Sequence, residues 1–75
     1  MRIYISDIAI KISFKQSEPS IKKILRKLNY YKKHKCFDKP IIIDKDGVLQ
    51  DGYINYLLCK LLSIKSIDVI VQEIQ

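Results

Sequence analysis

The junction between a predicted strand and a predicted helix at Asp51 and Gly52 has the residue types of an anion-binding site. The preceding residues 40–50 predict a strand, a tight turn at Gly47 and a short returning strand. A helix that begins directly after a strand has first-turn backbone N–H groups without intrahelical partners, and such groups bind phosphate. The alternative is that Asp51 caps the helix and occupies these groups itself. The candidate nucleotide- or phosphate-binding residues are Asp51, Gly52, Tyr53 and Asn55.

Three aspartates lie close to this turn and could hold magnesium beside a nucleotide: Asp44, Asp46 and Asp51. Aspartate is also frequent in turns because its carboxylate accepts hydrogen bonds from nearby backbone. The turn role is the favoured interpretation, so no resident metal site is expected.

The two cysteines, Cys36 and Cys59, have no CxxC spacing, and His34 is the only histidine. This set does not provide a zinc site. Both thiols are expected to be free, since a cytoplasmic setting disfavours disulfides, with Cys59 buried in a helix as a small apolar residue.

Positive charge is concentrated between residues 22 and 39. This segment contains eight lysines and arginines, and Asp38 is its single acidic residue. The local charge is +7, whereas the whole chain carries +6, so the remainder is close to neutral at −1. A basic helix with Tyr30, Tyr31 and His34 available for stacking is suited to nucleic-acid phosphate, although a lysine-rich face can equally be only solvated. The candidate nucleic-acid-binding residues are Lys22, Lys23, Arg26, Lys27, Lys32 and Lys33, and the first four of these are expected on the outer face of the helix.

A second candidate surface combines Tyr53, Tyr56 and Lys60, which are spaced to share one side of a helix. These side chains could contact a protein partner or a second copy of the chain. The alternative, favoured from the sequence, is that they pack against the first helix.

The chain of 75 residues predicts one domain, residues 1–75, near the lower size limit for a single core. Its apolar content of 48% with 29% charged residues is typical of a globular protein. The apolar runs are too short to span a bilayer, and residues 1–7 alternate instead of forming a signal peptide. A cytoplasmic protein without membrane contact is expected.

Hydrophobic spacing predicts an α/β (α+β) domain with one small mixed sheet and two main helices, in the order β-α-β-β-α-β. The first helix is expected to start near Ser17 or Glu18, with Pro19 in its first turn, and to end near Lys33. The apolar run at 41–43 predicts a strand covered on both faces. Residues 9–16 fit either a strand continuation or a connection. The other elements are strands at 2–8, 48–50 and 67–71 and a helix from about 51 to 62, with Ile54, Leu57, Leu58 and Leu61 inward.

This order, together with Lys-Pro-Ile-Ile-Ile-Asp before the turn and Asp-Gly-Tyr-Ile-Asn-Tyr at the second helix, resembles the ParB-like N-terminal domain. That fold is shared by partition proteins, sulfiredoxins and a free-serine kinase, and the resemblance covers most of the chain. Asp51, Gly52 and Tyr56 match the family motif. The resemblance implies that nucleotide phosphates bind at this helix start, with CTP or ATP and magnesium as candidate ligands.

Three departures from the family pattern bear on function. Asn55 stands where the family has a phosphate-binding arginine, a loss expected to cost about 1 to 3 kcal/mol of phosphate affinity. Cys59 lies two turns inside the helix rather than in the preceding loop, so sulfiredoxin chemistry is not expected. The chain also ends after the last strand, without the DNA-clamp domains of partition proteins, which predicts a stand-alone module.

The leading hypothesis from the sequence is therefore a nucleic-acid-associated accessory protein with a degenerate nucleotide pocket. The first alternative is a small phage or mobile-element protein that inhibits or regulates a protein partner, since the isoleucine- and lysine-rich composition fits an AT-rich genome. The second alternative is a nucleotide-dependent enzyme. It is disfavoured because no general base is identifiable beyond the turn aspartates.

Overall fold

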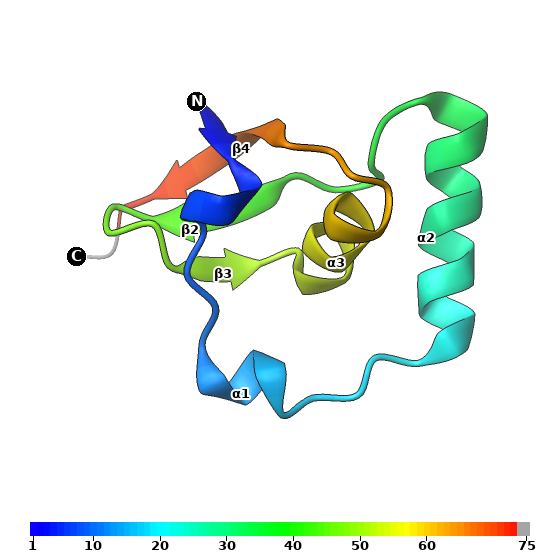
Figure 1. Cartoon of the computed structure of the whole chain (residues 1–75), viewed down its shortest axis with the longest axis horizontal. Helices are drawn as coiled ribbons and strands as arrows, with labels where there is room; N and C mark the ends of the chain where they lie inside the picture. The colour runs from blue at the N-terminus through cyan, green and yellow to red at the C-terminus, as the bar shows by residue number, and fades with distance from the viewer. Residues whose placement is uncertain (74–75) are drawn as a thin grey trace.

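A computed structural model describes residues 1–73 and has one four-stranded sheet with its helices on one side (Figure 1). The predicted order of strands and main helices is confirmed, with two short helical segments added near the N-terminus. The elements are β1 (Arg2–Tyr4), the 3-10 helix η1 (Ile5–Asp7), α1 (Ile12–Lys15), α2 (Ile21–His34), β2 (Ile41–Asp44), β3 (Leu49–Asp51), α3 (Tyr53–Leu61) and β4 (Ser66–Gln72).

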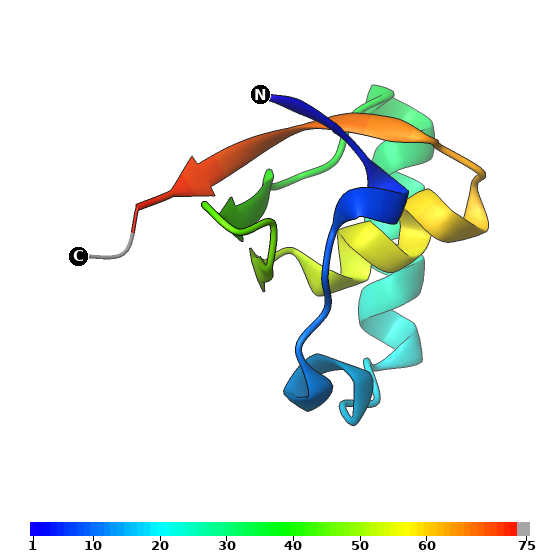
Figure 2. The same ribbon diagram turned by 60° about the vertical axis from the view of Figure 1, so that its left-hand side comes forward.

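The sheet has the strand order β1-β4-β2-β3 and is mixed. The two outer pairs, β1 with β4 and β2 with β3, are antiparallel, whereas β2 and β4 run parallel with Ile41 opposite Val69. A parallel pair needs a crossover, and α3 provides it between β3 and β4. In Figure 2 the long β4 strand passes over α3 toward the C-terminal end.

The two main helices form successive layers on the same side of the sheet. α3 packs against β2, and α2 packs mainly against α3. The expectation that the apolar run of β2 is covered on both faces is therefore wrong. Ile41 and Ile43 are buried under α3, but Ile42 is only half-buried, and its neighbour Ile70 in β4 is exposed on the open face of the sheet.

The core consists mainly of β-branched and leucine side chains from β2, β3, β4 and α3. Its fully buried members include Ile41, Ile43, Leu49 and Leu58. The predicted inward face of α3 was partly wrong, because Leu61 is exposed while polar Asn55 is buried. Among residues 1–73, no helix is long and apolar enough to cross a membrane.

The N-terminal third departs most from the predicted boundaries. The predicted strand at 2–8 ends at Tyr4, because the chain turns into η1 and buries Ile5 and Ile8. Residues 9–16 combine both interpretations: Ala9 forms a parallel bridge with Val48, and α1 follows.

The start of α2 also lies later than predicted. Its N-cap residue is Ser20 rather than Ser17 or Glu18, so Pro19 precedes the helix. Ser17 is used elsewhere, since its hydroxyl donates to the Phe14 carbonyl at 2.6 Å and closes α1.

Both cysteines are free, as predicted, and they differ in reactivity. Burial raises the pKa of the Cys59 thiol to about 11, whereas Cys36 is exposed. Because only the thiolate reacts, we expect a thiol reagent at pH about 8 to modify Cys36 rapidly and Cys59 only after denaturation. Time-resolved labelling followed by mass spectrometry checks this. Cys36→Ser should abolish the fast phase, and two fast thiols in the folded protein would contradict the assigned burial of Cys59.

Candidate functional site

The junction between β3 and α3 is built around Gly52, the N-cap residue of α3. Gly52 has φ of +91°, a left-handed conformation that glycine adopts without strain. Its backbone also approaches β2 closely, since a Cβ placed there would lie 3.1 Å from the Ile41 Cα and 3.3 Å from the Pro40 carbonyl oxygen. Glycine is thus required here both for conformation and for space.

Asp51 binds the backbone of this junction without capping the helix. Its carboxylate accepts the Gly52 N–H at 2.8 Å. No side chain in residues 1–73 makes a capping hydrogen bond to α3. The carboxylate of Asp51 therefore accepts only the Gly52 N–H. It does not use the first-turn amides of Tyr53, Ile54 and Asn55.

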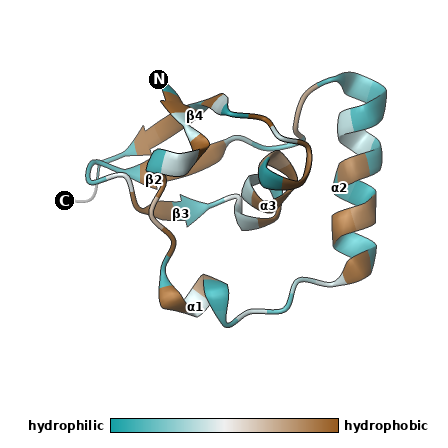
Figure 3. Ribbon diagram, viewed as in Figure 1, coloured by the Kyte–Doolittle hydropathy of each residue, from teal (hydrophilic) through white to brown (hydrophobic). Residues whose placement is uncertain are grey.

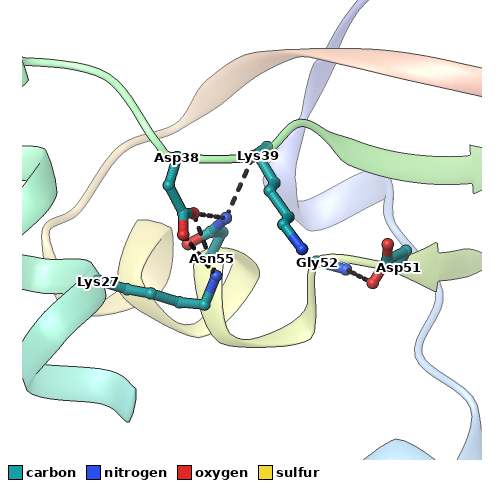
Figure 4. A network of polar contacts seen from close by, with 6 residues as sticks. All are labelled: Lys27, Asp38, Lys39, Asp51, Gly52 and Asn55. Carbon is teal, nitrogen blue, oxygen red and sulfur yellow. Dashed lines mark hydrogen bonds and ion pairs between the residues drawn. The ribbon is translucent and has the colours of Figure 1, made fainter.

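A cavity of about 200 Å³ lies at this end of α3. Two lysines contribute to its lining, Lys27 from α2 and Lys39 from the loop before β2. In Figure 4 the Lys39 side chain extends toward Gly52. The remaining lining residues are Phe14, Asp51, Gly52, Tyr53, Ile54 and Asn55. The cavity thus combines the start of a helix, which favours anions, with two lysines and one carboxylate, that of Asp51.

A polar network beside the cavity connects α2, the following loop and α3 (Figure 4). Lys27 Nζ donates to both carboxylate oxygens of Asp38, at 2.9 and 3.1 Å. Asn55 Nδ2 donates to Asp38 at 3.2 Å and to the Lys39 carbonyl at 3.1 Å. Asn55 is only 1% exposed, and its Oδ1 has no hydrogen-bond partner within the described part of the chain. Its side-chain N–H donors are thus both used in the network, so Asn55 can donate to an anion only through its backbone N–H.

The network changes the acidity of Asp38. Desolvation by burial raises the pKa of this carboxyl, but hydrogen bonds from Lys27 and Asn55 and the charge of Lys27 outweigh it, so the pKa lies below the ordinary value of 3.8. A lowered pKa in the folded state means that the ionised form stabilises the fold.

We therefore expect an acid-dependent loss of stability that originates from Asp38. The contribution is complete above the ordinary pKa of 3.8 and is lost as the pH falls below that value through the lowered pKa. Urea unfolding at a series of pH values checks this, with Asp38→Asn as the comparison. The variant should show a flatter pH profile than the unchanged protein over that range, and parallel profiles would contradict the assignment.

Asp44 has a structural role in the turn. Asp44 Oδ1 accepts the backbone N–H groups of Asp46 and Val48 at 2.9 and 3.0 Å, and Oδ2 accepts the Gln50 amide at 3.1 Å. Within residues 1–73 no group of three or more His, Cys, Asp or Glu side chains is placed to hold a metal ion. The turn interpretation of these aspartates is thus supported by the hydrogen bonds of Asp44.

Five of the six basic residues proposed for nucleic-acid contact are exposed on α2; Lys27 is not one of them. The expectation that Lys27 lies on the outer face is wrong, because its side chain is 16% exposed and is held by Asp38. Lys22, Arg26 and Lys33 follow one line along the outer face, spanning about 16 Å. Figure 3 shows this helix changing from mixed colouring at its N-terminal half to hydrophilic at its C-terminal end.

The proposed contact patch of Tyr53 and Tyr56 is not an exposed surface. Tyr56 is 7% exposed and belongs to the core, and the Lys60 ammonium lies 5.5 Å from its ring centroid. Tyr53 is half-buried and stacks on Phe14 with ring centroids 5.2 Å apart. The alternative that these tyrosines pack inside the protein is therefore correct. The predicted packing partner is wrong for Tyr53, which packs against Phe14 of α1 and not against α2.

Sequence reasoning did not identify Asp38, Lys39 and Phe14 as residues of the site. Asp38 is the only acidic residue within the basic segment, and this contrast was the available signal. Lys39 lies directly before Pro40, ahead of β2, and nothing in the sequence distinguished it from the other lysines of the basic segment. Phe14 was part of the segment whose structure the sequence left open.

The fold and the site together define a class: a small α+β domain with a lysine-lined cavity where a strand enters a helix. Two solved structures of a pNOB8-like ParB N-domain resemble the whole chain, with TM-scores of 0.82 and 0.77 and sequence identities of 21% and 25%. The chain therefore has the fold of a ParB-like N-terminal domain. It spans 30% and 27% of the lengths of those two chains. No protein-family model matches the sequence, and no curated protein matches it significantly.

Proposed function

We propose that the protein is a ParB-like binding module that associates with nucleic acid through the outer face of α2. The observation that carries the proposal is the row formed by Lys22, Arg26 and Lys33, exposed along one side of a helix in a segment of net charge +7. Cations in a row neutralise successive phosphates and release counterions. The similarity to ParB N-domains supports a role associated with DNA partition.

A second element of the proposal is a phosphate or nucleotide pocket at the start of α3. The arginine of the family motif is replaced by Asn55, but Lys39 brings positive charge to the same cavity from the loop before β2; Lys27 also lines it and is paired with Asp38. The first-turn amides of Tyr53, Ile54 and Asn55 supply donors. This pocket would position a phosphate by charge and backbone hydrogen bonds, and no residue around it is assigned a catalytic step.

Fluorescence anisotropy with a labelled DNA duplex tests the nucleic-acid function. For about three phosphate contacts, affinity should fall about 40-fold between about 50 and about 200 mM salt. The charge-reversal pair Lys22→Glu with Lys33→Glu should reduce the salt slope by about two, because two phosphate contacts are lost. The pair Lys15→Glu with Lys65→Glu makes the same charge change at exposed lysines outside this face. Equal effects of the two pairs, or binding that does not depend on salt, would reject the proposal.

Amide NMR spectra during titration with CTP and then ATP, each with magnesium, test the pocket. Saturable shifts should centre on residues 51–56 and diminish in Lys39→Ala, since that lysine lines the cavity. Lys45→Ala provides a control, because Lys45 is an exposed lysine outside the cavity lining. Unchanged spectra at millimolar nucleotide would show that the family ligand does not bind.

A further inference from the structure

An aromatic and cationic depression lies on α2 and shares no lining residue with the cavity at the start of α3. It measures about 430 Å³ and is lined by Arg26, Asn29, Tyr30, Lys33, His34 and Asp38. The Tyr30 and His34 rings lie side by side, with centroids 4.2 Å apart. Tyr30 is 38% exposed, so its ring is accessible from solvent.

The structure separates the two neighbouring tyrosines of α2 into different roles. Tyr31 stacks on Phe37, with ring centroids 4.7 Å apart, and is half-buried. Tyr30 lines the depression, whereas Phe37, on which Tyr31 stacks, packs against the core. An accessible ring that is not needed for packing is suited to receive a planar ligand.

The charge around the depression favours an anion. Arg26 and Lys33 lie at its lining, and the single carboxylate, Asp38, is neutralised by Lys27 at 2.9 Å. Asn29 adds an amide that can donate and accept hydrogen bonds at a base edge. Aromatic rings between cations are the arrangement by which proteins stack unpaired bases while holding the backbone phosphates.

We infer that the Tyr30–His34 depression is a stacking site for an unpaired base of single-stranded nucleic acid. The inference rests on the proposed nucleic-acid function and specifies its preferred form. In a duplex the base faces are already stacked, so Tyr30 would add nothing there. The cations of α2 then give general affinity, and the ring pair gives preference for single strands.

Anisotropy with a labelled oligothymidine and with a duplex of the same length, under the same salt conditions, tests the inference. Tyr30→Leu should weaken single-strand binding about ten-fold, because stacking on one ring is lost, and should leave duplex binding unchanged. Tyr30→Phe retains the ring and should bind like the unchanged protein. Tyr4→Leu is the matched control, since Tyr4 is 64% exposed on β1, outside this depression.

The outcomes separate this inference from the proposed function. If the protein binds duplex with the expected salt dependence but Tyr30→Leu binds single strands normally, the stacking site is rejected and the proposed function stands. If neither nucleic acid binds at low salt, the proposed function fails. Should Tyr30→Leu not fold, upfield shifts of the Tyr30 and His34 ring protons on addition of oligothymidine would support stacking, and unchanged ring signals would overturn it.

Discussion

Replacing Gly52 with alanine is expected to lower the free energy of unfolding by about 2 to 4 kcal/mol. Two costs add: a left-handed φ of +91°, and a new Cβ only 3.1 Å from the Ile41 Cα. The second contact is with backbone of a core strand, so relief requires β2 to move. A domain of this size is stable by only about 4 to 11 kcal/mol, which makes this a large fraction of the total. Urea unfolding followed by circular dichroism measures the change.

Gly47→Ala provides the matched control. Gly47 also has a positive φ, +83°, but its added Cβ would meet only the Asp7 carbonyl oxygen at 3.5 Å, an ordinary contact. The expected loss is about 1 to 2 kcal/mol from backbone conformation alone. The difference between the two variants isolates the close approach of α3 to β2. Equal losses of unfolding free energy in the two variants would show that the close approach of Gly52 to β2 does not contribute to the cost of Gly52→Ala.

Replacing Asp38 with alanine is expected to destabilise the protein by about 1 to 3 kcal/mol. Lys27, whose side chain is 16% exposed, would lose its carboxylate partner, and Asn55 would lose one of two acceptors. The cost stays below that of a fully buried ion pair because the Asp38 side chain is 28% exposed and partly screened by water. Urea unfolding measures this change as well.

Asp68→Ala tests the same kind of pair at the surface. Arg2 and Asp68 lie 3.7 Å apart with side chains 64% and 78% exposed, so this change should cost under about 0.5 kcal/mol. Adding Lys27→Met to Asp38→Ala should recover part of the loss, because no buried ammonium is then left alone. Strictly additive effects of Lys27→Met and Asp38→Ala would contradict a coupled pair.

Periodicity and turn residues predicted the sheet and the two main helices because these signals are local. The apolar run of β2, the glycine turn and the apolar spacing of α2 each specify an element without reference to the rest of the chain. The boundaries near the N-terminus failed because they depend on distant contacts. The strand after Met1 ends at Tyr4 where Ile5 bonds to Lys65, sixty residues later in sequence.

The candidate site was predicted in position but not in composition. Gly52 and the helix start were recognisable from the strand-to-helix transition. The roles of Lys27 and Asn55 were not, because helical spacing alone placed Lys27 outward and could not reveal Asp38 opposite it. The role of Tyr56 was left open for a related reason: a tyrosine at a helix surface and one in a core have the same spacing, and only the position of β2 and η1 distinguishes them.

The most direct test of the central claim is an amide NMR map of the ¹⁵N-labelled protein during titration with DNA at low salt. The account predicts that the largest shifts follow the outer face of α2, at Lys22, Arg26 and Lys33, and that they are reversed by added salt. Shifts concentrated instead on the open sheet face, around Tyr4 and Ile70, with α2 unchanged, would contradict it.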